Sequence, residues 1–135
     1  MVYIIRKMHF SASHRLHCKA LSDEENLKVY GICNNPHGHG HNYEIEVTIC
    51  GEPDSITGMI IDLKELKDIV QKEIISKVDH KYLNDDVTFF QDIVPTAENI
   101  CIIFWNILKD KIPYGELFEV KVYETPNNFA YYRGE

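Results

Sequence analysis

The chain has 135 residues, of which 44% are hydrophobic and 26% are charged, and its formal net charge is −7. This length and composition are typical of a globular protein with its own hydrophobic core, so we expect residues 1–135 to form one domain. The acidic balance argues against binding to nucleic acid or to an anionic membrane surface, because both depend on clustered Lys and Arg.

The cysteine pattern indicates free thiols. No two cysteines form a CxxC pair, which argues against a zinc site made of thiolates. The apolar run at the N-terminus is too short for a signal peptide or a membrane span. These features together predict a cytoplasmic protein. The four cysteines are Cys18, Cys33, Cys50 and Cys101.

The first half of the chain predicts two long strands separated by loops. Residues 2–14 are rich in β-forming side chains and predict the first strand, whereas residues 18–28 are polar and predict a mobile stretch. A turn-rich loop follows at residues 31–40. Residues 43–50 alternate between apolar and polar side chains, as in a half-buried strand, and residues 59–61 suggest a short extended segment.

Two helices are predicted in the middle of the chain. Asp62 has the character of an N-cap, and Glu65 three residues later suggests a capping box. Apolar residues then recur at helical spacing to about Val78. A second helix is expected to begin near Thr96 and to stop before Pro113, because the residue before a proline disfavours helical backbone.

Residues 117–124 and 129–133 predict a final pair of strands joined by a turn. The order of elements is therefore β-β-α-α-β-β. Strands joined by short turns pair in antiparallel fashion, and the two helices can cover one face of the sheet. We expect an α+β fold with a four-stranded antiparallel sheet and two helices on one face.

The histidine run within residues 36–43 is the strongest local signal for chemistry. His39 and His41 lie two residues apart where the second strand begins, so both side chains point to the same face. A zinc ion would satisfy their buried nitrogens, and His14 at the end of the first strand is the best third candidate. Three protein ligands with one open position are typical of catalytic zinc. The alternative is an ordinary set of surface-loop histidines.

The other histidines are weaker candidates for metal binding. His37 shares the parity of His39 and His41 and could compete as a ligand. His9 and His17 are expected to be solvated or satisfied by local contacts.

Cys33 lies in the loop before the histidine run, and its thiol is a candidate base or nucleophile. A thiol needs activation at neutral pH, and the pair Asp79–His80 after the first helix could supply it. Inert packing of Cys33 and a helix-terminal role for Asp79–His80 are the alternatives. Cys50 and Cys101 fit inert packing.

Glu124 continues the apolar, inward parity of the last long strand. A carboxylate there requires hydrogen bonds or a compensating charge, unless the strand end frays and Glu124 reaches solvent. Thr96 is explained by helix capping.

Several of these segments occur together in one family. The chain resembles the 6-pyruvoyl/6-carboxy-tetrahydropterin synthase family, particularly its animal 6-pyruvoyl members, nearly from end to end. The motifs that carry the resemblance are FSASHRL at 10–16, ENLK at 25–28, GICNNP at 31–36, GHGHNY at 38–43, TGM at 57–59, DHK at 79–81, Thr96 with Glu98 and Asn99, and VYET at 122–125.

The resemblance implies particular roles for these residues. It places three imidazoles on a zinc ion: His14, His39 and His41. It implies a catalytic triad of Cys33, Asp79 and His80. It implies a substrate pocket in which Glu124 binds the amino-pyrimidine edge of a pterin and Thr96 lies beside it. Family members carry Asn where this chain has His37.

The resemblance also implies the tunnelling fold, assembly as a homohexamer with active sites between subunits, and a lyase activity of tetrahydrobiopterin biosynthesis. The expected substrate is 7,8-dihydroneopterin triphosphate, with Mg²⁺ accompanying its triphosphate, and the expected products are 6-pyruvoyl-tetrahydropterin and inorganic triphosphate. One alternative is the sister activity, 6-carboxy-tetrahydropterin synthesis for deazapurines. The other is a non-catalytic zinc-binding scaffold.

Overall fold

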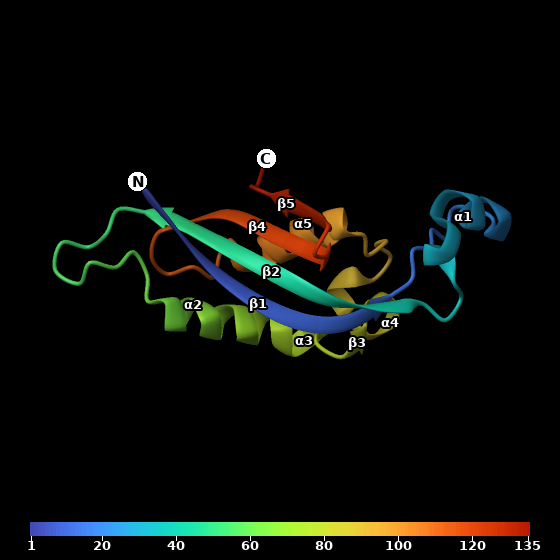
Figure 1. The fold of residues 1–135 in the computed structure, drawn as a ribbon, viewed down its shortest axis with the longest axis horizontal. Coiled ribbons are helices and arrows are strands. Elements are labelled where there is room, and N and C mark those ends of the chain that lie inside the picture. Colours follow the sequence, from blue (N-terminus) through green and yellow to red (C-terminus); the bar gives the residue numbers. More distant parts are fainter.

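The computed structural model describes residues 1–135, and its frame is a curved five-stranded sheet in the order β3-β1-β2-β4-β5 (Figure 1). All neighbouring strands are antiparallel except β3 and β1, which are parallel. The prediction of four antiparallel strands is therefore corrected to five. The strands are β1 (Val2–His14), β2 (His39–Gly51), β3 (Lys81–Tyr82), β4 (Glu116–Thr125) and β5 (Asn128–Tyr132).

The additional strand, β3, was not predicted because it is too short to show alternation. Tertiary contacts hold it in place instead. The His80 N–H donates to the carbonyl of Ser11 at 2.6 Å, and the Ser11 N–H donates to the Asp79 carboxylate at 2.9 Å. Such contacts link residues far apart in the sequence, so a local pattern cannot reveal them.

The β1–β2 ladder aligns the ends of the two longest strands. Its register pairs Val2 with Gly51 at one end and His14 with His39 at the other. Near the second end, the rings of Phe10 and Tyr43 stack at 4.8 Å between centroids. This register follows from the inward parity of both strands, because a slip by one residue would turn the apolar side chains to solvent.

Two helical segments cover one face of the sheet, which confirms the predicted α+β architecture. Figure 1 shows α5 behind β4 and β5, while α2 to α3 runs along β1. The first segment consists of α2 (Leu63–Val70), the π-helical η2 (Gln71–Ile75) and α3 (Ser76–Val78), and the second is α5 (Ala97–Leu108).

The starts of these helices follow their caps. The Thr96 hydroxyl accepts the N–H of Asn99 at 3.2 Å, as a helix N-cap does. Asp62 also caps its helix, but it accepts the N–H of Lys64, and no capping box with Glu65 forms.

A single apolar core joins the two helical segments to the sheet. It contains 22 buried residues, and the inward side chains of β2 are completely buried within it. Both long strands and both helical segments contribute to this core. The histidine-bearing ends of β1 and β2 are therefore fixed by packing on the rest of the fold.

A short helical arm replaces the mobile stretch predicted at residues 18–28. It consists of α1 (Asp23–Tyr30) and the 3₁₀ turn η1 (Gly31–Asn34), and it projects from one end of the sheet (Figure 1). Ser22 and Glu25 form the capping box that starts α1. The sequence pattern did not predict α1 because this helix has no apolar face, and its one buried residue is Asn26.

Smaller departures lie between the main elements. Two short helices, α4 (Leu83–Asp86) and η3 (Thr88–Phe90), connect β3 to α5. Residues 59–61 form no strand, although Ile61 is buried. No helix is both long enough and apolar enough to span a lipid bilayer.

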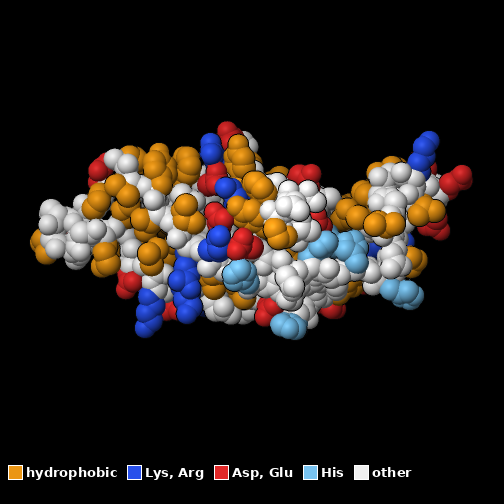
Figure 2. All heavy atoms as spheres, in the orientation of Figure 1, with side chains coloured by type: hydrophobic (Ala, Val, Ile, Leu, Met, Phe, Trp, Pro, Cys, Tyr) orange, Lys and Arg blue, Asp and Glu red, His pale blue; other side chains and the backbone are white.

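The other face of the sheet carries no helix and exposes apolar side chains. Figure 2 shows hydrophobic atoms gathered over one end of the sheet and over the α1 arm. Exposed residues on this face include Tyr3 and Ile5 on β1 and Phe129 and Tyr131 on β5. Exposed apolar area of this kind is typical of a surface that contacts another protein.

Candidate metal centre

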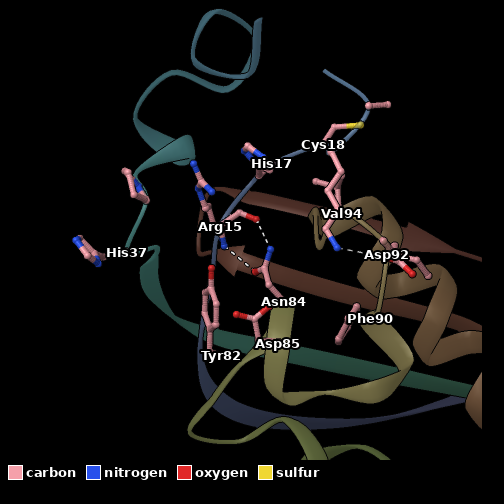
Figure 3. A pocket seen from close by; sticks show the side chains of 14 residues that line it. Arg15, His17, Cys18, His37, Tyr82, Asn84, Asp85, Phe90, Asp92 and Val94 are labelled. Atoms are coloured by element: carbon pink, nitrogen blue, oxygen red, sulfur yellow. Dashed lines mark hydrogen bonds and ion pairs between the residues drawn. The ribbon is translucent and has the colours of Figure 1, made fainter. Parts of the chain in front are cut away.

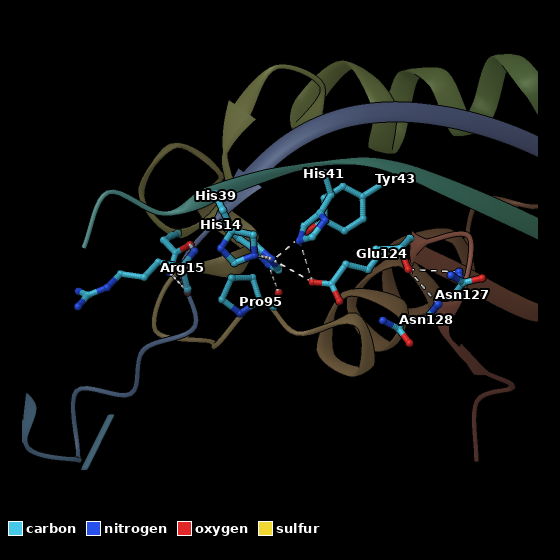
Figure 4. A network of polar contacts seen from close by, with 11 residues as sticks. His14, Arg15, His39, His41, Tyr43, Pro95, Glu124, Asn127 and Asn128 are labelled. Atoms are coloured by element: carbon cyan, nitrogen blue, oxygen red, sulfur yellow. Dashed lines mark hydrogen bonds and ion pairs between the residues drawn. The ribbon is translucent and has the colours of Figure 1, made fainter. Parts of the chain in front are cut away.

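Three imidazoles converge where β1 ends and β2 begins, as Figure 4 shows. The ring centroids of His14, His39 and His41 lie 4.7, 5.1 and 4.8 Å apart in the three pairs. His14 and His39 are cross-strand partners, and His41 follows His39 on the same face of β2. Strand register and the two-residue spacing therefore create the cluster directly.

Glu124 completes this group from β4. One of its carboxylate oxygens lies 3.0 Å from Nε2 of His14 and 3.2 Å from Nε2 of His41. One potential ligand atom from each of the three histidines and Glu124 lies within 4.8 Å of all the others. A carboxylate thus lies beside the three histidines, for which an open fourth ligand position was predicted.

The contacts within the cluster fit a divalent metal ion. Nε2 of His14 and Nε2 of His39 face each other at 3.1 Å, and two lone pairs so close need a cation or a proton between them. Nε2 of His41 is buried and has no hydrogen-bond partner, because the nearby Glu124 oxygen is not aligned to accept from it. Imidazole nitrogen and carboxylate oxygen are ordinary ligands of zinc.

Burial keeps two of the imidazoles neutral. The pKa of His39 is lowered below 6.5, first by desolvation and then by the nearby His14. Desolvation also lowers the pKa of His41, although the charge of Glu124 opposes it. The contact with Nε2 of His14 lowers the pKa of Glu124. At neutral pH the cluster therefore offers the neutral imidazoles of His39 and His41 and an ionised carboxylate, the protonation states in which these groups bind metals.

His14 is held from behind by two groups that the sequence analysis missed. Its Nδ1 lies 2.8 Å from the carbonyl oxygen of Pro95 and 3.1 Å from the hydroxyl of Tyr43. Tyr43 shares the parity of His39 and His41, and that parity could have identified it. The carbonyl of Pro95 carries no signal in the sequence, since any residue there would offer one.

The three residues predicted as a catalytic triad are not joined within one chain. Cys33 lies in η1, where its carbonyl accepts the N–H of Leu16 at 2.9 Å and its thiol makes no hydrogen bond. Asp79 and His80 follow α3, with 3.0 Å between the carboxylate and Nδ1 of the imidazole. The His80 side chain is 82% exposed, and its φ of 61° lies in the left-handed region.

The other predicted residues lie around this centre. Thr96 caps α5 and directly follows Pro95, whose carbonyl contacts His14. His37 is exposed and lies outside the metal-binding group. His9 lies 3.8 Å from Glu44 on the uncovered face of the sheet, and His17 contacts Asn34 at 3.0 Å.

A separate cavity of about 660 Å³ lies beside this region, lined by residues within 15–20 before the α1 arm and by residues of α4 and the segment after it (Figure 3). Arg15, His37 and Tyr82 are among the residues that line it. Asn84 fixes the backbone of Arg15 there, since it accepts the Arg15 N–H at 2.8 Å and donates to the Arg15 carbonyl at 2.7 Å. None of the metal-binding group lines this cavity.

Comparison with known proteins gives one consistent result. Residues 3–135 match the family model described as 6-pyruvoyl tetrahydropterin synthase. The chain is 52% identical to the human 6-pyruvoyl tetrahydrobiopterin synthase over 132 residues, covering 98% of this chain and 91% of the human one. A 6-carboxy-5,6,7,8-tetrahydropterin synthase of Rickettsia felis is 30% identical over 148 residues, covering 96% of this chain and 99% of its own.

The fold gives the same answer. The solved structure of 6-pyruvoyl tetrahydropterin synthase from Caenorhabditis elegans superposes with a TM-score of 0.94 at 42% identity, covering 99% of this chain and 96% of the other.

Proposed function

Because the chain belongs to the 6-pyruvoyl tetrahydropterin synthase family, we propose that it converts 7,8-dihydroneopterin triphosphate to 6-pyruvoyl-5,6,7,8-tetrahydropterin and releases inorganic triphosphate. This reaction is a step in tetrahydrobiopterin synthesis. The observation that carries the assignment is the cluster of His14, His39, His41 and Glu124 in a chain so similar to animal members of the family.

The reaction needs no external redox partner. The pterin ring is reduced while its hydroxylated side chain is oxidised, and the triphosphate leaves from the end of that side chain. The chemistry therefore consists of proton transfers and one elimination. The protein must bind the substrate, hold its side chain still and move protons between carbon and oxygen.

The metal of this centre is proposed to be zinc, held by His14, His39 and His41. When bound, zinc supplies Lewis acidity, which makes a neighbouring hydroxyl and its C–H bonds easier to deprotonate. Glu124, proposed as a substrate-binding residue, contacts the ligands themselves. Its carboxylate would therefore meet the substrate close to the metal and orient it there.

Cys33 is the proposed base that moves the carbon-bound protons, with His80 and Asp79 setting its protonation state. No hydrogen bond links the thiol to His80 within one chain. We therefore infer that the pair Asp79–His80 is supplied by a neighbouring copy, in the homohexamer that the family resemblance implies. Thr96 at the start of α5 is the proposed neighbour of the pterin ring.

The proposal also covers a second metal ion, the cellular location and the choice between two products. Mg²⁺ is expected to accompany the triphosphate, because that group carries several negative charges. A cytoplasmic location fits the four free cysteines. The 52% identity to the human 6-pyruvoyl protein against 30% to the 6-carboxy protein of Rickettsia felis favours the pyruvoyl product.

Product analysis tests this proposal. The purified, zinc-loaded protein is incubated with 7,8-dihydroneopterin triphosphate, and the pterin product is identified by mass spectrometry. The pyruvoyl product together with inorganic triphosphate is expected, and a chelator should abolish both. Carboxy-tetrahydropterin with acetaldehyde would assign the sister activity, and an unchanged substrate would leave only a zinc-binding scaffold.

A further inference from the structure

The Tyr43 hydroxyl contacts the side of His14 that faces away from the other ligands. We propose that Tyr43 is a positioning residue, which holds His14 in the tautomer and ring orientation that metal binding requires. This role rests on the metal site of the proposed function, although it does not depend on which product the enzyme makes.

The tautomer of His14 follows from the chemistry of its neighbours. The carbonyl oxygen of Pro95, 2.8 Å from Nδ1, can only accept a hydrogen bond, so Nδ1 must carry the hydrogen. The lone pair available to a metal then belongs to Nε2. That atom is the one that lies 3.1 Å from Nε2 of His39 and 3.0 Å from the carboxylate of Glu124.

Tyr43 contacts the same N–H from a second direction. Its hydroxyl oxygen lies 3.1 Å from Nδ1 of His14 and has no other hydrogen-bond partner among the protein atoms. Because two acceptors contact the same N–H, they fix both the position and the orientation of the imidazole ring. Rotation of the ring about its own axis would break both contacts.

The position of Tyr43 makes this contact rigid. The residue is 0% exposed, and its ring lies parallel to that of Phe10 with an interplanar angle of 6°. Both rings belong to the ladder that pairs Phe10 with Tyr43, so the phenol cannot swing away from His14. A phenylalanine would fill the same apolar space, whereas a buried hydroxyl is costly unless it makes a contact.

The test replaces Tyr43 by Phe and measures the affinity for zinc by competition with a chromophoric chelator. The affinity is expected to fall about tenfold, as it does when an outer partner of a metal-bound histidine is removed. The matched control is Tyr132→Phe, which removes a hydroxyl bonded to the Glu135 carbonyl at 2.9 Å, away from the cluster. That variant should bind zinc like the wild type.

Two further measurements separate positioning from a general effect on stability. The visible spectrum of the cobalt-substituted protein should change in Tyr43→Phe and stay unchanged in Tyr132→Phe, because it reports ligand geometry. In the zinc-loaded wild type, nitrogen NMR should show His14 bound through Nε2 with a protonated Nδ1. The NMR experiment needs no variant, so it can still overturn the proposal if Tyr43→Phe fails to fold.

The possible outcomes distinguish the two proposals. Unchanged zinc affinity and cobalt spectrum in Tyr43→Phe, or zinc bound through Nδ1 of His14, would overturn the role of Tyr43 and leave the enzyme assignment standing. A wild type that binds zinc and loses affinity on Tyr43→Phe, yet makes no pyruvoyl product, would support Tyr43 and refute the assignment. A wild type that does not bind zinc would refute both.

Discussion

Glu124 gives the histidine cluster a negative charge that imidazoles alone would lack. Its oxygen lies 3.0 Å from Nε2 of His14 and 3.2 Å from Nε2 of His41, and the contact with His14 lowers its pKa. A carboxylate so close to neutral nitrogens favours a divalent cation over a monovalent one, because its attraction scales with the charge of the ion. The same residue can therefore serve the metal and the substrate.

Glu124→Gln tests how much of this charge acts on the metal. The amide keeps the shape of the side chain and removes the charge, so we expect zinc affinity to fall about tenfold. Chelator competition measures this affinity, with Glu116→Gln at the exposed start of β4 as the control. Wild-type zinc affinity together with a raised KM would instead restrict Glu124 to the substrate.

Cys33 can be tested separately from the metal. Cys33→Ala should retain zinc and lower kcat by a factor of about 10² to 10⁴, the usual contribution of a general base. Release of inorganic triphosphate measures the rate, and Cys50→Ala removes a buried thiol as the control. If triphosphate release is unchanged in Cys33→Ala, the thiol is not the base.

Among the elements, the turn before β2 determines where His14 and His39 meet. Gly38 adopts a φ of 73°, and a Cβ atom added there would lie 2.9 Å from the carbonyl oxygen of His14 and 3.0 Å from the ring of Tyr82. A side chain at this position would therefore push the end of β1 away from the start of β2. The close approach of the two backbones requires glycine.

Gly38→Ala should both destabilise the fold and weaken the metal site. We expect a loss of about 1–3 kcal/mol from strained backbone, measured by denaturant unfolding, together with reduced zinc affinity. Gly58→Ala is the control, because Gly58 has the same φ of 73° and nothing within 4 Å of the added Cβ. It should cost stability without affecting zinc. Equal zinc affinity in both variants would contradict this account of the turn.

The junction between α3 and β3 depends on one carboxylate. Asp79 accepts the N–H of Ser11, and this bond is the largest cause of its lowered pKa, below 3.8. The folded pKa is below the unfolded one, so the ionised group stabilises the fold above the unfolded value. This stabilisation is lost as the pH falls through the folded value.

Comparison of the wild type with Asp79→Asn isolates this titration. The amide oxygen can still accept the hydrogen bond, but it has no charge to lose. The wild type should have the larger free energy of unfolding, by less than about 1 kcal/mol, since the carboxylate is partly exposed. This difference should be present at about pH 5 and shrink toward about pH 3. A difference that is constant over this range would show that Asp79 does not stabilise the junction through its charge.

At the scale of the whole molecule, we expect metal binding and folding to be coupled. The cluster draws ligands from β1, β2 and β4, which are brought together only in the folded chain. A metal that binds the folded state alone stabilises it by about 4 kcal/mol at a thousandfold excess over Kd. For a chain of this size, that corresponds to a shift in Tm of roughly 15 °C.

Thermal unfolding with and without a chelator measures this coupling. Chelation should lower the Tm of the wild type and leave that of His41→Ala nearly unchanged, because that variant has lost a ligand. His9→Ala, which removes a histidine from the uncovered face of the sheet, should respond like the wild type. Equal Tm values for the wild type with and without the chelator would show that metal binding does not stabilise the folded chain.

The uncovered face of the sheet also belongs to this scale. Its exposed aromatic and aliphatic side chains, together with the separation of Cys33 from Asp79 and His80, are consistent with an active site completed by other copies of the chain. Light scattering of the purified protein gives the number of copies directly.

The sequence by itself determined the long elements and the histidines of the candidate metal centre. β-forming side chains predicted β1, alternation predicted β2 and β4, and caps and helical spacing predicted the two covering helices, because these signals extend over many residues. His39 and His41 were evident from their spacing, since two residues on a strand share a face. The match of motifs over the whole chain supplied the family and the expected chemistry.

Only the tertiary structure decided how distant residues combine. The α1 arm has no apolar face, and β3 is held by contacts to Ser11, so neither left a periodic signal. The place of Glu124 beside the ligands, and the two acceptors behind His14, depend on the register of three strands and on the carbonyl of Pro95. Contacts between residues far apart in the chain arise from packing, and a local sequence pattern does not encode them.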